Sequence, residues 1–505
     1  MPPDALPSLD EMVTRLERAL ATSPADSTEL VWIEAQRSQV GSGRGRREAA
    51  RPSAPAAPAA PSAPAAPAGR GGSADAGAPA GPWRERSLLV RVRQSGRSGL
   101  HRTAGVEPSD LENAVREALA QARLAPPTAG EPLASAGERR GEPGGARGAG
   151  AAPAAGTGQG GAGQGDPLHD PELAALEPER VRAMLDGVAE RGETLRLAWL
   201  EGLVAIVNSS GLRRSTRVTA ASFETRCGRG PGSGAGTGAA RRFDGLYLQD
   251  TLDRARARHA GDGAAAGTAG APAAADLMMV LSEQSVAALL DLFNRHGLTA
   301  AAQRDAGSCL RGKLGEPLLA SCLSLRDDGT DPRTLPFPFD LAGWPKRRVD
   351  LVVDGVFATP AVDVSLAQEI GRSPTPHAMA PDESIAANLI LLPGDRAPLP
   401  QDELLRQAEG GIWVGALAGL ECYDPGRLRF RATAKGVRRI AGGALGPPLP
   451  DLVWEDDLPA ALSRAQAVGD HPVTIVTGDM LFGATAAPLL ALRGAPDLQL
   501  GTATS

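Results

Sequence analysis

The stretch Leu289-Leu290-Asp291-Leu292-Phe293-Asn294-Arg295-His296 decides how the C-terminal half of this chain is organised. Its apolar residues, together with Val286, recur at helical spacing and predict a helix over 282–296 with one buried face. Among its polar residues, Asp291 and His296 are the two that could in principle bind a metal. The helix is therefore predicted to pack in a core, and its polar positions are the first candidates for a functional site.

The region around this helix, 276–505, is rich in short β-branched stretches that are separated by turn signals such as Asp354-Gly355 and Pro393-Gly394. The predicted strands are 348–353, 388–392, 411–416 and 473–476. Many short strands with regular turns are typical of closed sheets. We predict a C-terminal β-rich, barrel-like domain over 276–505.

The N-terminal region predicts a small α+β domain over 1–40 and 84–126. A capping box, Ser8-Leu9-Asp10-Glu11, predicts a helix that ends near Ala21. The segment 29–35 predicts a strand whose natural partner is 88–93. A second capping box, Ser109-Asp110-Leu111-Glu112, predicts another helix.

The middle region, 168–260, predicts an α/β meander. A helical pattern covers 177–190, and strand patterns follow. These predicted strands are 194–200, 203–207 and 214–225, with a turn at 208–211. The fold class predicted for the whole chain is therefore α+β.

Two long segments interrupt these units. The chain contains 62 Gly and 43 Pro, unevenly spread, and segments 41–83 and 127–167 hold few large apolar side chains. Such segments bury too little surface to offset chain entropy, so we predict a disordered insertion at 41–83 and a disordered linker at 127–167. The Gly/Ala tracts 228–240 and 261–275 are predicted to be loops.

Composition excludes several classes of protein. The net charge is −6 with acids and bases interspersed, which argues against nucleic-acid binding. The sequence has no basic N-terminal region leading into an apolar core and no uninterrupted apolar run long enough for a membrane span, so we expect a cytoplasmic location. Its four Cys form no C-x-x-C pair, which predicts reduced thiols.

Ordered landmarks in the C-terminal half resemble the TldD/PmbA family, also called modulators of DNA gyrase. The landmarks are Gly312-Lys313-Leu314-Gly315-Glu316, Asp327-Asp328, Pro338-Phe339-Asp340, Asp354-Gly355-Val356, Asn388-Leu389-Ile390-Leu391-Leu392-Pro393-Gly394 and Asp424-Pro425. Single landmarks are ordinary turns, but their order and spacing are specific. The family pattern is altered at Asp340-Leu341-Ala342-Gly343 and at Pro374-Thr375-Pro376-His377.

The resemblance implies a degenerate zinc helix. In the TldD branch an H-E-x-x-x-H helix binds zinc, whereas the TldE/PmbA branch lacks the ligands and is the non-catalytic partner. Matching the helices places Asp291 at the first His, Leu292 at the Glu and His296 at the second His. Loss of the general base alone would remove roughly 10² to 10⁴ in rate. No catalytic, cofactor-binding or metal-ligating residue is therefore assigned to this chain.

Three functions remain open. The resemblance favours a non-catalytic subunit without a cofactor of its own, which joins a zinc-containing TldD-like metalloprotease as a heterodimer in the proteolysis of unfolded peptides. The alternatives are a divergent metallopeptidase with an altered metal site and a homodimeric peptide-binding or scaffold protein. His377 is predicted to be a surface residue, and Asp166, His169 and Asp170 to cap the helix that follows them.

Overall fold

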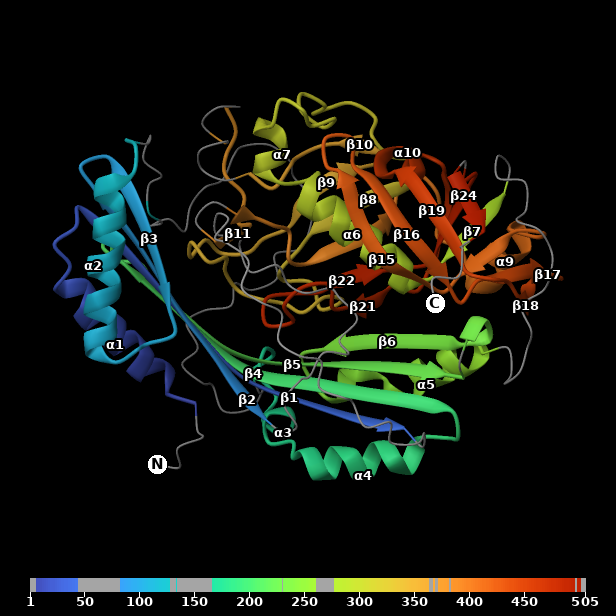
Figure 1. Cartoon of the computed structure of the whole chain (residues 1–505), viewed down its shortest axis with the longest axis horizontal. Helices are drawn as coiled ribbons and strands as arrows, with labels where there is room; N and C mark the ends of the chain where they lie inside the picture. The colour runs from blue at the N-terminus through green and yellow to red at the C-terminus, as the bar shows by residue number, and fades with distance from the viewer. Residues whose placement is uncertain are drawn as a thin grey trace, which may run out of the picture.

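The computed structural model describes residues 6–43, 82–127, 133, 166–228, 230–259, 277–362, 367, 371–380, 383–495 and 497–500. The α+β class is confirmed: a long antiparallel sheet carries helices on one face and the C-terminal domain on the other (Figure 1). Most of both predicted disordered segments, and the tract 261–275, lie outside the described residues. None of the described helices is long and apolar enough to cross a membrane.

The long sheet has six strands in the order β3-β2-β1-β4-β5-β6. They are β1 (Ser27–Gly43), β2 (Trp83–Gln94), β3 (Arg97–Thr103), β4 (Glu193–Asn208), β5 (Arg213–Cys227) and β6 (Gly234–Ala240). The predicted pairing of 29–35 with 88–93 is confirmed, because Glu29 lies opposite Arg91 in antiparallel register. On its other side Glu29 lies opposite Asn208, so the N-terminal and middle segments share one sheet.

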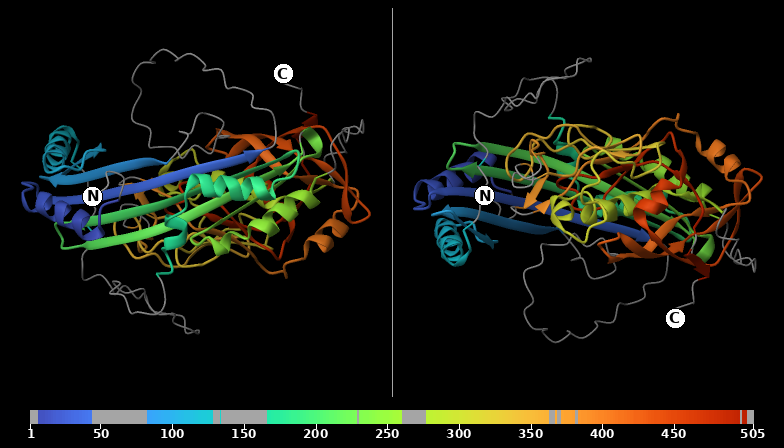
Figure 2. Two further views of the ribbon diagram at one scale, coloured as in Figure 1. Left: turned by 90° about the horizontal axis from the view of Figure 1, so that it is seen from below. Right: turned by 90° about the horizontal axis from the view of Figure 1, so that it is seen from above.

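Helices cover one face of this sheet along its length (Figure 2). They are α1 (Leu9–Ala21), α2 (Pro108–Leu124), α3 (Pro171–Ala174), α4 (Pro178–Val188) and α5 (Leu248–Ala257). Side chains alternate along a strand, so the odd-numbered residues of β4 share the face that the helices cover. Leu203 and Val207 pack with α1 and α2, and Leu195 and Leu197, further toward the start of the strand, pack with α4 and α5. Ser8 caps α1 as predicted, by accepting a hydrogen bond from the backbone N–H of Glu11.

Two strand predictions need correction. Strands 194–200 and 203–207 form one continuous strand, β4, through Gly202, where a Cβ would lie 2.2 Å from Leu481 Cδ1. The tract 228–240, predicted to be a loop, contains β6. A Cβ at Gly234 would lie 1.9 Å from the carbonyl oxygen of Ala255, so glycine lets α5 approach this edge strand closely.

The other face of the long sheet packs on the C-terminal domain. Leu200, Val204 and Ile206 of β4 share an apolar cluster with Phe337 and Leu481. The junction also contains Arg241, which is 5% exposed and follows β6. Its guanidinium donates hydrogen bonds to five carbonyl oxygens, those of Thr219, Leu335, Pro336, Met480 and Leu481. This single side chain therefore joins the long sheet to two C-terminal loops.

The C-terminal domain is built from three principal sheets around a central helix, α6 (Glu283–His296). Their orders are β10-β9-β8-β13-β22-β21, β18-β17-β14-β7-β23-β20 and β15-β16-β19-β24. The first comprises β8 (Leu323–Asp327), β9 (Val349–Val353), β10 (Val356–Phe357), β13 (Leu389–Pro393), β21 (Val473–Ile475) and β22 (Thr485–Ala487). The second comprises β7 (Met278–Leu281), β14 (Ile412–Val414), β17 (Arg438–Ala441), β18 (Ala444–Pro448), β20 (Ala465–Val468) and β23 (Leu490–Arg493). The third comprises β15 (Ala416–Asp424), β16 (Arg429–Lys435), β19 (Leu452–Asp457) and β24 (Asp497–Leu500).

The prediction of a barrel-like domain is therefore wrong in one respect, since each of these described sheets is open. Val286, Leu289 and Phe293 of α6 belong to the same apolar core as residues of all three sheets. A helix fills the space that strands of a small closed barrel would enclose with their own side chains. Smaller elements are α7 (Ala300–Arg304), α9 (Gln401–Gln407), α10 (Leu458–Ser463), β11 (Ala378–Ala380) and β12 (Glu383–Ser384).

Candidate functional site

The helix predicted over 282–296 is present as α6, but its polar positions are not arranged as metal ligands. Ser282 caps its N-terminus by accepting from the backbone N–H of Ser285. The Nε of Arg295 donates to the Oδ2 of Asp291 at 2.9 Å. Leu292 is 6% exposed and belongs to the apolar core. Burial and the charge of Arg295 lower the pKa of His296, against the opposing effect of Asp291.

These residues do not fit a zinc site. The Asp291 carboxylate is paired with a guanidinium, and Leu292 offers no group that could accept a proton from water. No group of three or more His, Cys, Asp or Glu side chains in the described part of the chain could hold a metal ion. Cys309 and Cys422 are partly buried free thiols, and burial raises the pKa of each. A thiolate is the form that binds zinc, so these raised pKa values disfavour such a role.

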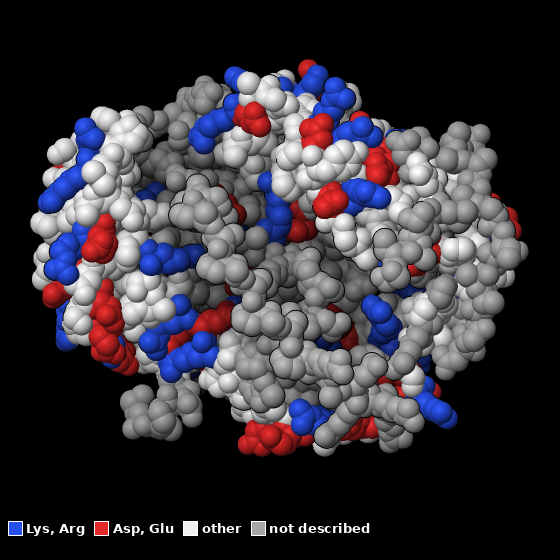
Figure 3. Space-filling model, in the orientation of Figure 1, with Lys and Arg blue, Asp and Glu red and all other residues white. Residues whose placement is uncertain are grey.

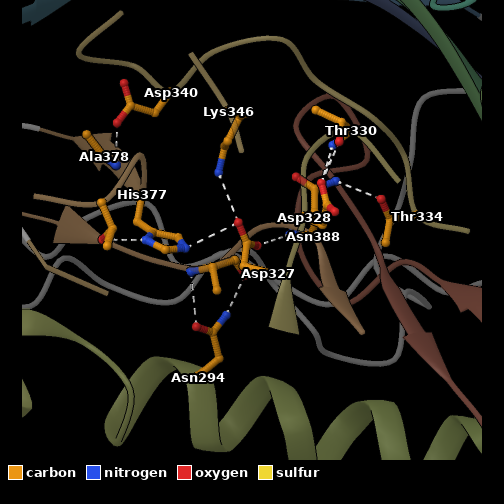
Figure 4. Close-up of polar contacts among 12 residues, drawn as sticks. Asn294, Asp327, Asp328, Thr330, Thr334, Asp340, Lys346, His377, Ala378 and Asn388 are labelled. Atoms are coloured by element: carbon orange, nitrogen blue, oxygen red, sulfur yellow. Dashed lines mark hydrogen bonds and ion pairs between the residues drawn. The ribbon is translucent and has the colours of Figure 1, made fainter. Parts of the chain in front are cut away.

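One polar residue of α6, Asn294, faces the protein interior and is 3% exposed. Its side-chain amide donates to the Ala386 carbonyl at 2.8 Å and accepts from the Ala386 N–H at 3.1 Å. Two residues further on, the backbone N–H of Asn388 donates to Oδ1 of Asp327 at 2.7 Å. The helix thus positions the segment whose Asn388 N–H donates a hydrogen bond to Asp327, a member of a buried polar cluster (Figure 4).

We define the buried polar cluster as Asp327, Lys346, Thr375 and His377. Asp327 ends β8, and its Oδ2 lies 3.6 Å from Lys346 Nζ and 3.2 Å from His377 Nε2. His377 Nδ1 lies 2.7 Å from Thr375 Oγ1. Burial opposes ionisation of Asp327, but Lys346, His377 and the Asn388 N–H together hold its pKa below the ordinary value. Burial lowers the pKa of His377, which Asp327 offsets only in part.

Asp340 lies beside this cluster in the segment whose family pattern is altered. Its carboxylate accepts hydrogen bonds from the backbone N–H groups of Ala342, Trp344 and Ala378. Burial raises its pKa to about 6, and the charge of Lys346 acts in the opposite direction. The carboxylate therefore shapes the loop 340–346 and ties it to β11.

The buried polar cluster cannot reach a substrate in this conformation, because Asp327 and His377 are both 0% exposed. It joins β8, the loop 340–346 and the segment 375–378 instead. The prediction that His377 is a surface residue is wrong: its partners Asp327 and Thr375 compensate for its burial. The sequence landmarks had singled out Asp327, Asp340 and Asn388 but not Lys346, although the scarcity of Lys in this chain could have indicated it.

Asp170 caps a helix, as predicted, by accepting from the backbone N–H of Glu172 in the short helix α3. His169 instead points to β4, where its Nε2 lies 2.9 Å from Glu201 Oε1. Asp166 accepts from the backbone N–H of Leu168. The three residues do not form a ligand cluster. Among the described residues on the face shown in Figure 3, charged side chains of both signs are interspersed.

Known proteins resemble this chain in its C-terminal domain and in its fold. Residues 275–495 match the profile of a family described as PmbA/TldA metallopeptidase C-terminal domain. The crystal structure of TldE from Thermococcus kodakarensis has a TM-score of 0.70 at 15% identity, covering 97% of this chain and 99% of that one. The crystal structure of a putative modulator of a DNA gyrase from Thermotoga maritima has a TM-score of 0.69 at 16% identity, covering 96% of this chain and 99% of that one. The crystal structure of a putative modulator of DNA gyrase from Bacteroides thetaiotaomicron has a TM-score of 0.68 at 17% identity, covering 97% of this chain and 99% of that one. No curated protein matches the chain.

Fold and site together define an α+β protein in which a metallopeptidase-type C-terminal domain rests on a long antiparallel sheet. Residues 275–495 are similar to the C-terminal domain of the TldD/PmbA family, in agreement with the resemblance of the ordered landmarks. The structural matches are below 25% identity, so they establish the shared fold alone.

Proposed function

We propose that this chain is a non-catalytic, TldE/PmbA-like subunit that assembles with a TldD-like zinc metalloprotease in the cytoplasm. The observation that carries the proposal is the state of α6. The helix keeps its apolar packing, while Asp291 pairs with Arg295 and the position of the general base is the buried Leu292. Zinc and proton transfer would therefore come from the partner subunit, and this chain would contribute shape and peptide contacts.

An edge strand beside α6 supports a role in holding peptides. β15 ends its sheet, and among the described strands only β16 pairs with it. β15 also lies against α6. An unpaired strand edge can bind an extended peptide through main-chain hydrogen bonds, which do not depend on the peptide sequence. Unfolded peptides are the class of ligand that such an edge accepts.

Metal analysis of separate and combined subunits tests this proposal. The chain expressed alone should contain no stoichiometric zinc and should not cleave unfolded peptides. Co-expression with a family member that carries H-E-x-x-x-H should give a co-purifying, zinc-containing, active complex. Stoichiometric zinc and peptidase activity in the isolated chain, both abolished by His296→Ala but not by the exposed control His471→Ala, would overturn the proposal in favour of an altered metallopeptidase. A stable homodimer that never captures the partner would favour a scaffold instead.

A further inference from the structure

Arg295 stands out on α6 because much of its hydrogen-bonding capacity is unused. Its Nε is held by Asp291, one helical turn earlier, which fixes the plane of the guanidinium. Within the part of the chain that the structure describes, neither terminal nitrogen of Arg295 donates a hydrogen bond to the protein. The two nitrogens form a planar fork that matches the geometry of a carboxylate.

The ion pair of Arg295 and Asp291 is partly accessible to solvent. The Arg295 side chain is 28% exposed and that of Asp291 is 24% exposed. Burial nevertheless raises the pKa of Asp291, against the opposing effect of Arg295, so the surroundings are poor in water. A partly desolvated guanidinium binds an anion more strongly than one on an open surface.

The loop 477–482 lies beside the guanidinium of Arg295 and carries no side chain at the nearest position, Gly478. A Cβ there would lie 3.7 Å from a terminal nitrogen of Arg295. The next residue, Asp479, receives two hydrogen bonds from Arg37 of β1, at 2.9 and 2.8 Å. Asp479 also accepts from the backbone N–H of Leu481. The long sheet therefore holds the loop in place next to Arg295.

We propose that Arg295 binds a carboxylate of an extended peptide, either its C-terminal carboxylate or an acidic side chain, beside the loop 477–482. The inference rests on the proposed peptide-holding function and names the ligand group that this chain recognises. Asp291 orients the guanidinium through Nε and leaves the fork free. In this chain a permanent positive charge on α6 acts on the peptide, where the TldD-type helix is expected to hold a metal.

Binding of labelled peptides to the isolated full-length chain tests this site. Fluorescence anisotropy would compare three versions of one unstructured ten-residue peptide: a free C-terminus without acidic residues, the same peptide amidated, and an amidated peptide with one internal Glu. We expect at least one carboxylate-bearing peptide to bind about tenfold more tightly than the neutral amide, as for a charge-assisted hydrogen-bonded pair. The peptide that gains affinity identifies the source of the carboxylate.

Arg295→Gln should remove this preference, and Arg295→Lys should reduce it because a lysine has no fork. Arg406→Gln is the matched control. Arg406 also pairs with acidic residues on its own helix, α9, but it is exposed and lies on a different helix from Arg295. Equal binding of all three peptides to the unaltered chain, or a preference that survives in a folded Arg295→Gln variant, would refute the inference. A preserved preference in a chain that captures no zinc-containing partner would refute only the proposed function.

Discussion

At the scale of single residues, the C-terminal domain shifts the pKa values of two carboxylates, Asp340 and Asp350, in opposite directions. The folded protein raises the pKa of Asp340 to about 6, chiefly through burial, from an ordinary value of 3.8. The fold therefore favours protonated Asp340, whose stabilising contribution is complete below about pH 4 and lost as the pH rises through about 6. Asp350 behaves in the opposite way: burial raises its pKa, but hydrogen bonds from Arg348 and Arg326 outweigh this and lower it.

The variant Asp340→Asn should consequently carry a pH-dependent penalty. Relative to the unaltered protein, the decrease in the free energy of unfolding should be larger at pH 4.5 than at pH 7.5, by on the order of 2 kcal/mol. The reason is that only the unaltered protein gains stability from protonated Asp340 at the lower pH. Urea denaturation at both pH values measures it. Asp350→Asn serves as the control and should show the reverse trend, because the contribution of Asp350 is lost as the pH falls. A penalty for Asp340→Asn that grows with pH would contradict the assignment.

At the scale of elements, glycine decides where a helix can approach a strand. Gly234 and Gly238 both belong to β6, which α5 covers. A Cβ at Gly234 would meet the Ala255 carbonyl at 1.9 Å, whereas one at Gly238 would meet Thr251 Oγ1 at 3.4 Å and the Leu246 carbonyl at 3.5 Å. The backbone of α5 must move in the first case and not in the second.

Gly234→Ala should therefore lower the free energy of unfolding by about 2 kcal/mol or more, through overpacking of α5 on β6. Gly238→Ala should cost much less. Urea denaturation of the two variants side by side makes the comparison, and near-equal losses would show that α5 does not lie as close to β6 as described.

Much of this element-level structure was predictable from the sequence, and the failures have physical causes. Capping at Ser8 and the apolar period of 282–296 depend on neighbouring residues, and both were predicted. The strand β6 was missed because Gly and Ala have low strand propensity, and its pairing with β5 overrides that preference. The burial of His377 was missed because its compensating partner, Asp327, is distant in sequence. Open sheets were predicted as a barrel because periodicity does not reveal that a helix fills the centre.

At the scale of the whole molecule, the C-terminal domain is fixed to the long sheet by polar as well as apolar contacts. Among the described residues no carboxylate accepts a hydrogen bond from Arg241, which donates to five backbone carbonyls instead. Burial lowers its pKa to about 9. The guanidinium remains charged at neutral pH, and its removal would leave those carbonyls without a donor.

Arg241→Met should therefore lower the free energy of unfolding by about 3 kcal/mol or more. Hydrogen exchange should also accelerate in the two loops around Leu335 and Leu481, since both lose their connection to the sheet. Arg242→Met is the control, because the Arg242 side chain is 48% exposed and pairs loosely with Asp244. Its effect should stay within about 0.5 kcal/mol, and exchange that is unchanged in Arg241→Met would argue against its joining role.

The central position of β1 in the long sheet has a consequence for how the protein is made. β1 lies between β2 and β4, and its register with β4 joins Glu29 to Asn208 and Gly43 to Thr194. During synthesis, the first strand must wait until β4 has left the ribosome before it can be enclosed on both sides. Such distant pairings slow folding, because the chain between them loses its freedom before the contacts form. The apolar stretch of β1 around Val31 therefore stays incompletely covered in the nascent chain until β4 has followed it.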